Sequence, residues 1–248
     1  SFLQQCYNIA DTLIVGQCIG AGALAAVGSA YTLMVFLISV LLGLAMGSGT
    51  VFSLHYGAGN HVALRRSIFS SFALIGIVTL ILNVVVFIWL DPILRLLQVP
   101  QDIYGMMRSY LWIIFCGIVF TFIYNFYASL LRAVGDSVTP LWFLAVSVVL
   151  NIALDLFFIL QLDWGIQGAA AATVLAQGVA ALGIIIYTYR RRPELRWHHE
   201  DMCFDRTCLK EIASFSTLTC VQQSVMNLGI LMVQGLVNSF GATIMAAF

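Results

Sequence analysis

The chain has 248 residues, of which 61% are hydrophobic and only 9% are charged, and its mean hydropathy is +0.99. Soluble domains carry about 25% charged residues, so this composition excludes a soluble globular protein and predicts a polytopic protein of the lipid bilayer. The formal net charge is zero, so the charge balance gives no indication of a nucleic-acid partner.

Apolar segments follow one another along the chain, and several are longer than the roughly 20 residues that a membrane-spanning helix needs. We expect helices over 2–19, 24–55, 66–90, 104–131, 139–161, 166–189 and 210–239. Turn-forming residues separate them at Gly57–Asn60, Asp91-Pro92 with Val99-Pro100, Gly135–Ser137 and Asp163–Gly165. No strand pattern competes with these helices. The expected fold class is therefore all-α and integral to the membrane, a bundle of six transmembrane helices plus a seventh helix.

Basic residues orient the bundle, because loops rich in Lys and Arg stay in the cytoplasm. Most of the Lys and Arg residues follow the second, fourth and sixth predicted helices: Arg65, Arg66, Arg132, Arg190, Arg191, Arg192, Arg196, Arg206 and Lys210. The loops after these three helices are therefore expected inside the cell, and Asp91, Asp102 and Asp163 outside. Only Arg95 and Arg108 lie elsewhere.

The longest polar stretch, 190–208, is the one candidate linker, and we expect an ordinary topology-setting loop rather than a lipid-binding segment. It predicts a division into residues 1–189, a six-helix lobe with a truncated first helix, and residues 209–248, the truncated first helix of a second lobe. A short internal repeat agrees with two lobes, because Gly20-Ala21 and Ala25-Ala26 recur as Gly241-Ala242 and Ala246-Ala247. The chain starts at Ser1 and ends in an apolar run, so we expect a part of a longer protein.

Two carboxylates, Asp11 and Asp155, interrupt segments that otherwise have the composition of lipid-embedded helix. A charged side chain at membrane depth costs about 2.5–3.5 kcal/mol or more, so these residues are functional candidates. Tyr7 lies one turn before Asp11 and Asn151 one turn before Asp155, so each pair shares one face of its helix. Carboxylate and amide oxygens suit a small hard cation such as Na⁺, and two nearby carboxylates in a low dielectric also favour binding of a proton. The sequence therefore predicts ion-coupled transport.

Structural interpretations compete with these functional ones. Tyr7 would serve equally as an interfacial anchor, and Asn151 would serve to hydrogen-bond a neighbouring helix. Gly43 and Gly47 form a GxxxG pattern, which indicates close helix contact rather than chemistry.

Two further features predict neither a cofactor nor an enzyme. The six cysteines show no CxxC pattern and no metal-ligand spacing, so we expect structural thiols. Gly135-Asp136 resembles half of an intramembrane aspartyl protease motif, but the topology predicts it in a cytoplasmic loop, away from the other carboxylates. We therefore expect no enzymatic activity.

A set of motifs spreads over nearly the whole chain. They are Tyr7-Asn8-Ile9-Ala10-Asp11-Thr12 with Val15-Gly16, Gly20-Ala21-Gly22-Ala23-Leu24-Ala25-Ala26-Val27, Tyr56-Gly57-Ala58-Gly59, Leu131-Arg132-Ala133-Val134-Gly135-Asp136-Ser137, Asn151-Ile152-Ala153-Leu154-Asp155 and Gly168-Ala169-Ala170-Ala171-Ala172-Thr173. In this order and placement they resemble the multidrug and toxic compound extrusion (MATE) transporters. The resemblance implies a multi-pass antiporter of the bacterial cytoplasmic membrane, built from two six-helix lobes. It would couple entry of H⁺ or Na⁺ to export of amphipathic drugs or metabolites, and would work as a monomer.

The resemblance also implies a cation site inside the first lobe, formed by Asp11, Asn151, Asp155 and Thr173, with Tyr7 beside it. Taken alone, Thr173 ends a run of small residues, which is typical of close helix packing. The alternative function is that of a flippase for lipid-linked saccharides, from a related two-lobe family. Such flippases generally need a wide cationic cavity, and the predicted membrane interior holds no clearly placed Arg or Lys.

Overall fold

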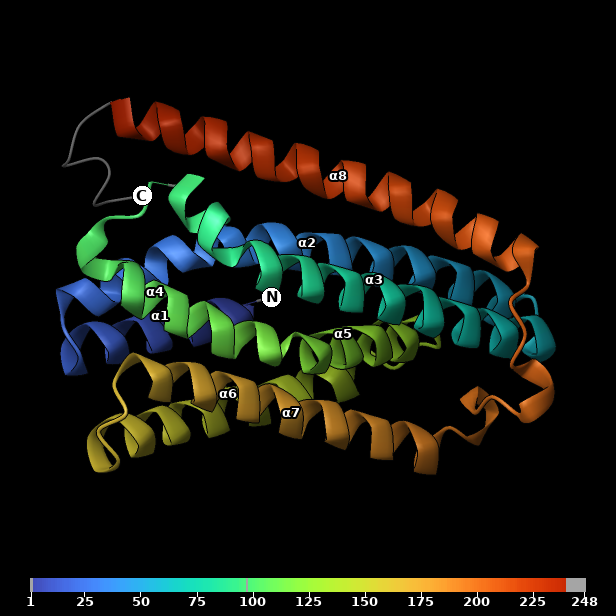
Figure 1. Ribbon diagram of the computed structural model, residues 1–248. Helices are drawn as coiled ribbons and strands as arrows, with labels where there is room; N and C mark the ends of the chain where they lie inside the picture. The colour runs from blue at the N-terminus through green and yellow to red at the C-terminus, as the bar shows by residue number, and fades with distance from the viewer. Residues whose placement is uncertain (1, 97, 240–248) are drawn as a thin grey trace.

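The computed structural model describes residues 2–96 and 98–239, and the described chain is built from helices without strands (Figure 1). The all-α class expected from the apolar runs is confirmed. The elements are α1 (Phe2–Cys18), α2 (Ala21–Gly57), α3 (His61–Leu96), α4 (Gln101–Cys116), α5 (Ile118–Ala133), α6 (Val138–Leu156), η1 (Phe157–Gln161), α7 (Ile166–Arg191), η2 (Pro193–Leu195), η3 (His199–Asp201) and α8 (Arg206–Ser239).

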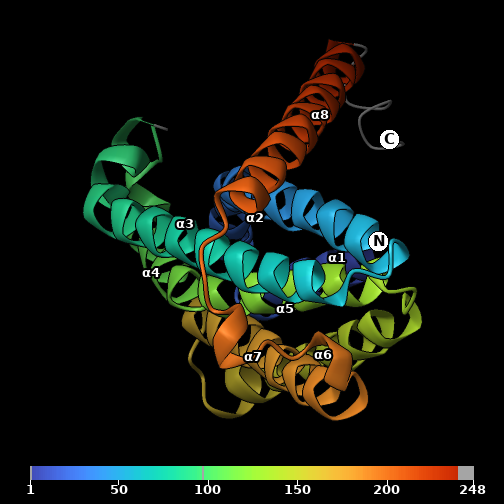
Figure 2. The ribbon, with the colours of Figure 1, turned by 90° about the vertical axis from the view of Figure 1, so that its right-hand side faces the viewer.

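The long helices run roughly side by side in layers (Figure 1). Helices α6 and α7 pack against each other on one side, α2 and α3 lie on the other, and α1, α4 and α5 fill the space between them. Helix α8 packs along α2 and, at its start, against α3. The perpendicular view shows that α8 then leans away from the other helices (Figure 2).

Length and apolarity alone assign four helical segments of the described chain as membrane spans: Leu33–Gly57, His61–Leu96, Val138–Gln161 and Ile166–Arg191. The pair α4 and α5 adds a fifth if the chain crosses the membrane once through both helices. Helix α1 has only 17 described residues, fewer than the roughly 20 that a span needs. These features identify a multi-pass membrane protein.

Two of the predicted helices differ clearly from the structure. The single helix expected over 104–131 is divided at Gly117 into α4 and α5, which meet at an angle of 46°. Glycine has no Cβ atom, and this allows α7 to approach the bend closely. A Cβ atom at position 117 would lie 2.6 Å from the side chain of Val174 in α7. Helix α3 was expected to end at residue 90, but it continues through Pro92 to Leu96. Tyr104 and Arg108 of α4 donate hydrogen bonds of 2.7 and 2.9 Å to Asp91, which ties this extension to the bundle.

The three basic connections lie together at one end of the bundle, on the right in Figure 1, as the orientation derived from the Lys and Arg residues predicts. Asp136 lies in one of them and acts as a cap for the start of α6. Its carboxylate accepts hydrogen bonds from the backbone N–H and the hydroxyl of Thr139, at 3.0 and 2.8 Å, and from the hydroxyl of Tyr187 at 3.1 Å.

Replacing Asp136 with alanine is expected to destabilise the chain by about 0.5–2 kcal/mol, because the start of α6 loses its cap. Partial burial opposes the charge, but the hydrogen bonds from Thr139 and Tyr187 outweigh it and lower the pKa of Asp136 below its ordinary value of 3.8. The ionised carboxylate therefore stabilises the fold above about pH 4, and this contribution is lost as the pH falls further. Thermal unfolding in detergent measures both effects, and the exposed Glu200→Ala is the control. Equal melting temperatures for Asp136→Ala and the native chain would contradict the capping role.

Close contact between α2 and α8 explains the GxxxG pattern. A Cβ atom at Gly47 would lie 2.5 Å from the backbone of Ser216, and one at Gly43 would lie 3.3 Å from the Cα atom of Cys220. The interpretation of this pattern as a site of close helix contact is confirmed. The division into 1–189, 190–208 and 209–248 stays a prediction, and the second copy of the repeat, 241–247, lies outside the described residues.

Candidate functional site

The predicted site residues meet where α1, α6 and α7 pack together. Asp11 is 6% exposed, Asn151 and Asp155 are fully buried, and Thr173 is 5% exposed. Tyr7 lies one turn before Asp11 on α1 and is partly buried. All five predicted residues therefore come from three different helices to one place, although their functional roles stay predictions.

Hydrogen bonds connect four of these residues. The hydroxyl of Tyr7 donates to the hydroxyl oxygen of Thr173 over 3.0 Å. Both ends of the Asn151 amide have hydrogen-bond partners in one orientation. In it, the nitrogen donates to Asp155 over 3.1 Å, and the carbonyl oxygen accepts from the Thr173 hydroxyl over 3.3 Å. The opposite amide orientation would give Thr173 a donor and leave Asp155 without one. Thr173 therefore links the tyrosine of α1 to the amide of α6.

The two carboxyl groups are the chemically unusual part of this arrangement. Those of Asp11 and Asp155 lie within hydrogen-bonding reach of each other. Within the described chain, the Oδ1 atom of each group is buried and has no hydrogen-bond partner. Two ionised carboxylates about 4 Å apart repel by about 4 kcal/mol at an effective dielectric constant of 20. A proton or a small cation between them would remove this repulsion, and the unpartnered oxygens are suitable ligands for either.

Local backbone structure changes immediately after Asp155. Helix α6 ends at Leu156 and continues as the π-helical turn η1. A π-helical turn rotates the following side chains relative to an α-helix, and such turns often occur at functional sites. The turn ends at Gln161, and the connection that follows contains Asp163 and Gly165, both with positive φ, so α7 folds back against α6 and brings Thr173 to Asn151. The predicted break at Asp163–Gly165 is confirmed.

Tyr110 of α4 is a site neighbour that the sequence did not indicate. It is buried, and it lies close enough to Asp11, Asp155 and Tyr7 for their charges to act on its hydroxyl. A single tyrosine in an apolar helix is common, so no spacing pattern distinguished Tyr110 from the other tyrosines. The packing of α4 against α2 and α7 brings it there.

Comparison with known proteins places this arrangement in context. The sequence profile of the MatE family matches residues 1–157. Over 99% of this chain and 55% of the relative's length, the chain is 31% identical to the probable multidrug resistance protein YpnP of Bacillus subtilis. It is 29% identical, with the same coverage, to the probable multidrug resistance protein YoeA of the same species. The chain thus spans about half the length of these curated relatives.

Solved structures of multidrug resistance transporters have the same fold. An outward-facing structure of a MATE family transporter matches with a TM-score of 0.87, over 96% of this chain and 53% of that protein. An inward-facing structure of such a transporter matches with a TM-score of 0.85, over 98% of this chain and 56% of that protein. Both are 24% identical in sequence, so they support the arrangement of the helices.

Proposed function

Since the chain belongs to the MatE family, we propose that it forms the cation-coupling half of a transporter that exports amphipathic small molecules in exchange for H⁺ or Na⁺. The observation that carries this proposal is the buried carboxyl pair, Asp11 and Asp155, with Asn151, Thr173 and Tyr7 bonded around it. Such a pair is shielded from water between helices. The net charge of the site is more negative when it is empty than when it holds a proton or Na⁺.

The net charge of the pair would determine how α1 packs against its neighbours. This helix contributes Asp11 to the pair and packs against α2, α6 and α7. With the site empty, repulsion between the carboxylates favours separation of α1 from α6, and a bound cation favours their contact. A ligand shifts a conformational equilibrium by its difference in affinity for the two states, and here that difference is a large electrostatic one. Cation binding would thus select one packing of α1 and drug binding the other.

The charge of the interior favours cationic or neutral cargo over an anionic lipid-linked saccharide. No Lys or Arg is among the buried side chains of the described residues, whereas Asp11 and Asp155 are. A positively charged or neutral amphipathic compound fits this electrostatic environment without an unpaired buried charge. The flippase alternative has no comparable support in this chain.

Transport by the full-length protein in proteoliposomes tests the proposal. An inward H⁺ or Na⁺ gradient is expected to drive export of a fluorescent amphipathic cation, and collapse of that gradient by an ionophore should stop it. Export that ignores both gradients, or movement of a lipid-linked saccharide in place of the cation, would contradict the proposal.

Thr173→Val is expected to weaken cation or proton binding by about 1–3 kcal/mol, because the Tyr7 hydroxyl and the Asn151 amide each lose a partner. The control is Thr188→Val, another buried threonine of α7 whose hydroxyl donates only to the carbonyl of Ile184. The measurement is the half-saturating cation concentration for efflux. A similar change in both variants would show that Thr173 acts through helix packing alone.

A further inference from the structure

A second group of polar side chains lies inside the bundle, on the cytoplasmic side of the carboxyl pair. Thr121 of α5 donates a hydrogen bond to the side-chain carbonyl of Gln177 in α7, and Asn125 donates over 2.8 Å to the backbone carbonyl of Thr121. Gln177 follows Thr173 by one helical turn, and α7 runs toward the cytoplasm in the predicted orientation. The group therefore lies about 6 Å from the site in that direction. The function proposed above gives these residues no role.

Ser147 adds a hydroxyl from α6 at the same level. Phe143 and Asn151 lie four residues before and after it, and both contact α7: Phe143 packs on Gly183, and Asn151 bonds to Thr173. Ser147 lies between them on the same face of α6 and is only 7% exposed. The antiparallel pairing of α6 with α7 places it level with the hydrogen bond between α5 and α7. The inner polar layer is defined as Thr121, Asn125, Ser147 and Gln177.

The ring of Phe143 packs between α6 and α7 at the next level toward the cytoplasm. A Cβ atom at Gly183 would lie 2.6 Å from the Cε1 atom of this ring, so the two helices meet closely there. The ring also lies 6.2 Å from that of Tyr187, in an edge-to-face arrangement. The Tyr187 hydroxyl in turn donates to Asp136 in a cytoplasmic connection. Phe143 thus separates the inner polar layer from the polar groups at the cytoplasmic end.

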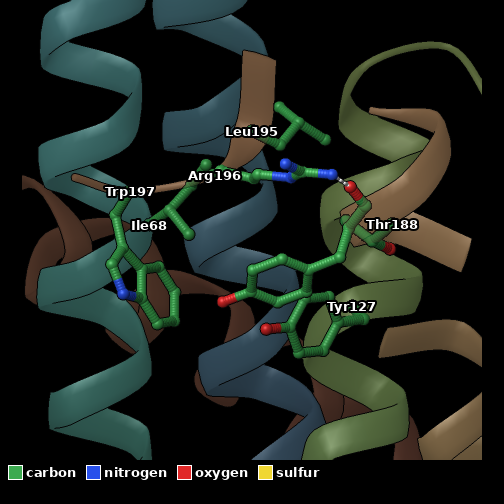
Figure 3. Close-up of a pocket in the computed structure, with 7 residues that line it drawn as sticks. Ile68, Tyr127, Thr188, Leu195, Arg196 and Trp197 are labelled. Atoms are coloured by element: carbon green, nitrogen blue, oxygen red, sulfur yellow. Dashed lines mark hydrogen bonds between the residues drawn. The ribbon is translucent and has the colours of Figure 1, made fainter. Parts of the chain in front are cut away.

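The linker between α7 and α8 closes another side of the bundle at this end. Figure 3 shows Trp197 and Leu195 beside Ile68 of α3, around a cavity large enough for about one water molecule. Asp201 holds the linker there through an ion pair of 3.0 Å with Arg65 at the start of α3. A path along α3 is therefore blocked by a fastened segment of chain. The path between α6 and α7 is blocked by an aromatic ring, which a change of rotamer can move.

A cation that moves inward from the carboxyl pair needs polar partners on its way. The part of α6 from Val138 to Asp155 spans about 25 Å, and an unpartnered charge in so long an apolar interior is costly. Hydroxyl and amide oxygens replace part of the hydration shell of Na⁺, and they hydrogen-bond the water that carries a proton. The inner polar layer supplies such oxygens where the path begins.

We propose that the inner polar layer is a second, uncharged binding site for the coupling cation, and that Phe143 is the gate between this site and the cytoplasm. Na⁺ or a hydrated proton passes from Asp155 through the layer, and then between α6 and α7 when the ring of Phe143 rotates away. The inference rests on the proposed function for the arrival of the cation at Asp155. The passage itself rests on the packing of α5, α6 and α7.

Ion leak without any drug tests the gate. The full-length protein is reconstituted in proteoliposomes that contain a dye sensitive to pH or to Na⁺, and an inward gradient of that ion is imposed. Phe143→Ala is expected to dissipate the gradient several-fold faster than the native protein, because alanine leaves the passage open. Trp142→Ala is the control, since it removes the neighbouring aromatic ring of α6, which is 69% exposed, and it should not leak.

A double variant separates an open passage from a packing defect. Gln177→Leu removes the amide from the inner polar layer, so Phe143→Ala combined with Gln177→Leu should be about as tight as the native protein. A leak that persists in the double variant would show that Phe143→Ala only loosens the bundle, and would overturn the passage. Absence of a leak of either ion through Phe143→Ala alone would overturn it as well.

Drug efflux by Gln177→Leu, with Phe143 intact, gives an independent measurement. The maximal rate is expected to fall several-fold because cation release slows, whereas cation binding at equilibrium is retained because the carboxyl pair is unchanged. Gln167→Leu, at the exposed first turn of α7, should keep the native rate. A native rate for Gln177→Leu would overturn the second site. Native efflux that ignores both ion gradients would instead contradict the proposed function, and the leak measurements, which need no drug, would still decide the passage.

Discussion

Asp155→Asn is expected to abolish cation-driven efflux while leaving the fold intact. Asparagine has nearly the same shape, and its amide can still bond to Asn151, so packing around the fully buried side chain is retained. The change removes one of the two charges whose repulsion a proton or Na⁺ relieves. We expect apparent cation affinity to fall about ten-fold or more, which corresponds to about 1.4 kcal/mol.

Initial rates of efflux in proteoliposomes, measured at several H⁺ and Na⁺ gradients, check this expectation. Asp163→Asn is the matched control, because Asp163 lies in the turn between η1 and α7, is exposed, and adopts a positive φ that asparagine tolerates. Efflux by Asp155→Asn with the native dependence on both gradients would exclude Asp155 from the coupling step.

Gly47→Ala is expected to destabilise the contact between α2 and α8 by about 1–3 kcal/mol, although alanine favours a helix. The added methyl group would lie 2.5 Å from both the N and Cα atoms of Ser216, which are backbone atoms and cannot rotate away. Helix α8 must therefore shift, and the buried Ser216 loses its close contact with α2.

Thermal unfolding in detergent distinguishes this effect from helix propensity. Gly57→Ala, at the end of the same helix, places a methyl group with no atom within 4 Å, so the clash is absent. Alanine is about 1 kcal/mol more favourable than glycine inside a helix, so the control variant should be unchanged or slightly more stable. Equal changes in melting temperature for the two variants would mean that α2 and α8 are not in close contact.

Helix positions were largely predictable because a bilayer-spanning segment must be apolar over its whole length. The breaks at Gly59, Gly135 and Gly165 were equally predictable, since each of these glycines adopts a positive φ in a turn. The bend at Gly117 was not, because it depends on the close approach of Val174 from a helix distant in sequence. Pro92 was wrongly predicted to end the helix for a related reason. Contacts of Asp91 with α4, which is later in the sequence, stabilise the helix that continues past the proline.

The candidate site was predictable in part. The four-residue spacing of Tyr7 with Asp11 and of Asn151 with Asp155 indicated one polar face on each helix. That these two faces meet, with Thr173 between them, depends on the packing of α1 against α6 and α7, which no local pattern specifies. The attachment of the linker was not predictable, because its polar composition does not indicate the contacts that Leu195, Trp197 and Asp201 make in the folded chain.

Cation binding to the purified chain tests the central claim most directly. Titration calorimetry with Na⁺, between about pH 5 and pH 8 and in buffers with different ionisation enthalpies, reports both Na⁺ binding and the protons exchanged. We expect the native chain to bind Na⁺ or to exchange a proton in this range, and Asp155→Asn to lose that signal. Equal signals from the two proteins would contradict the claim that Asp11 and Asp155 form the coupling site.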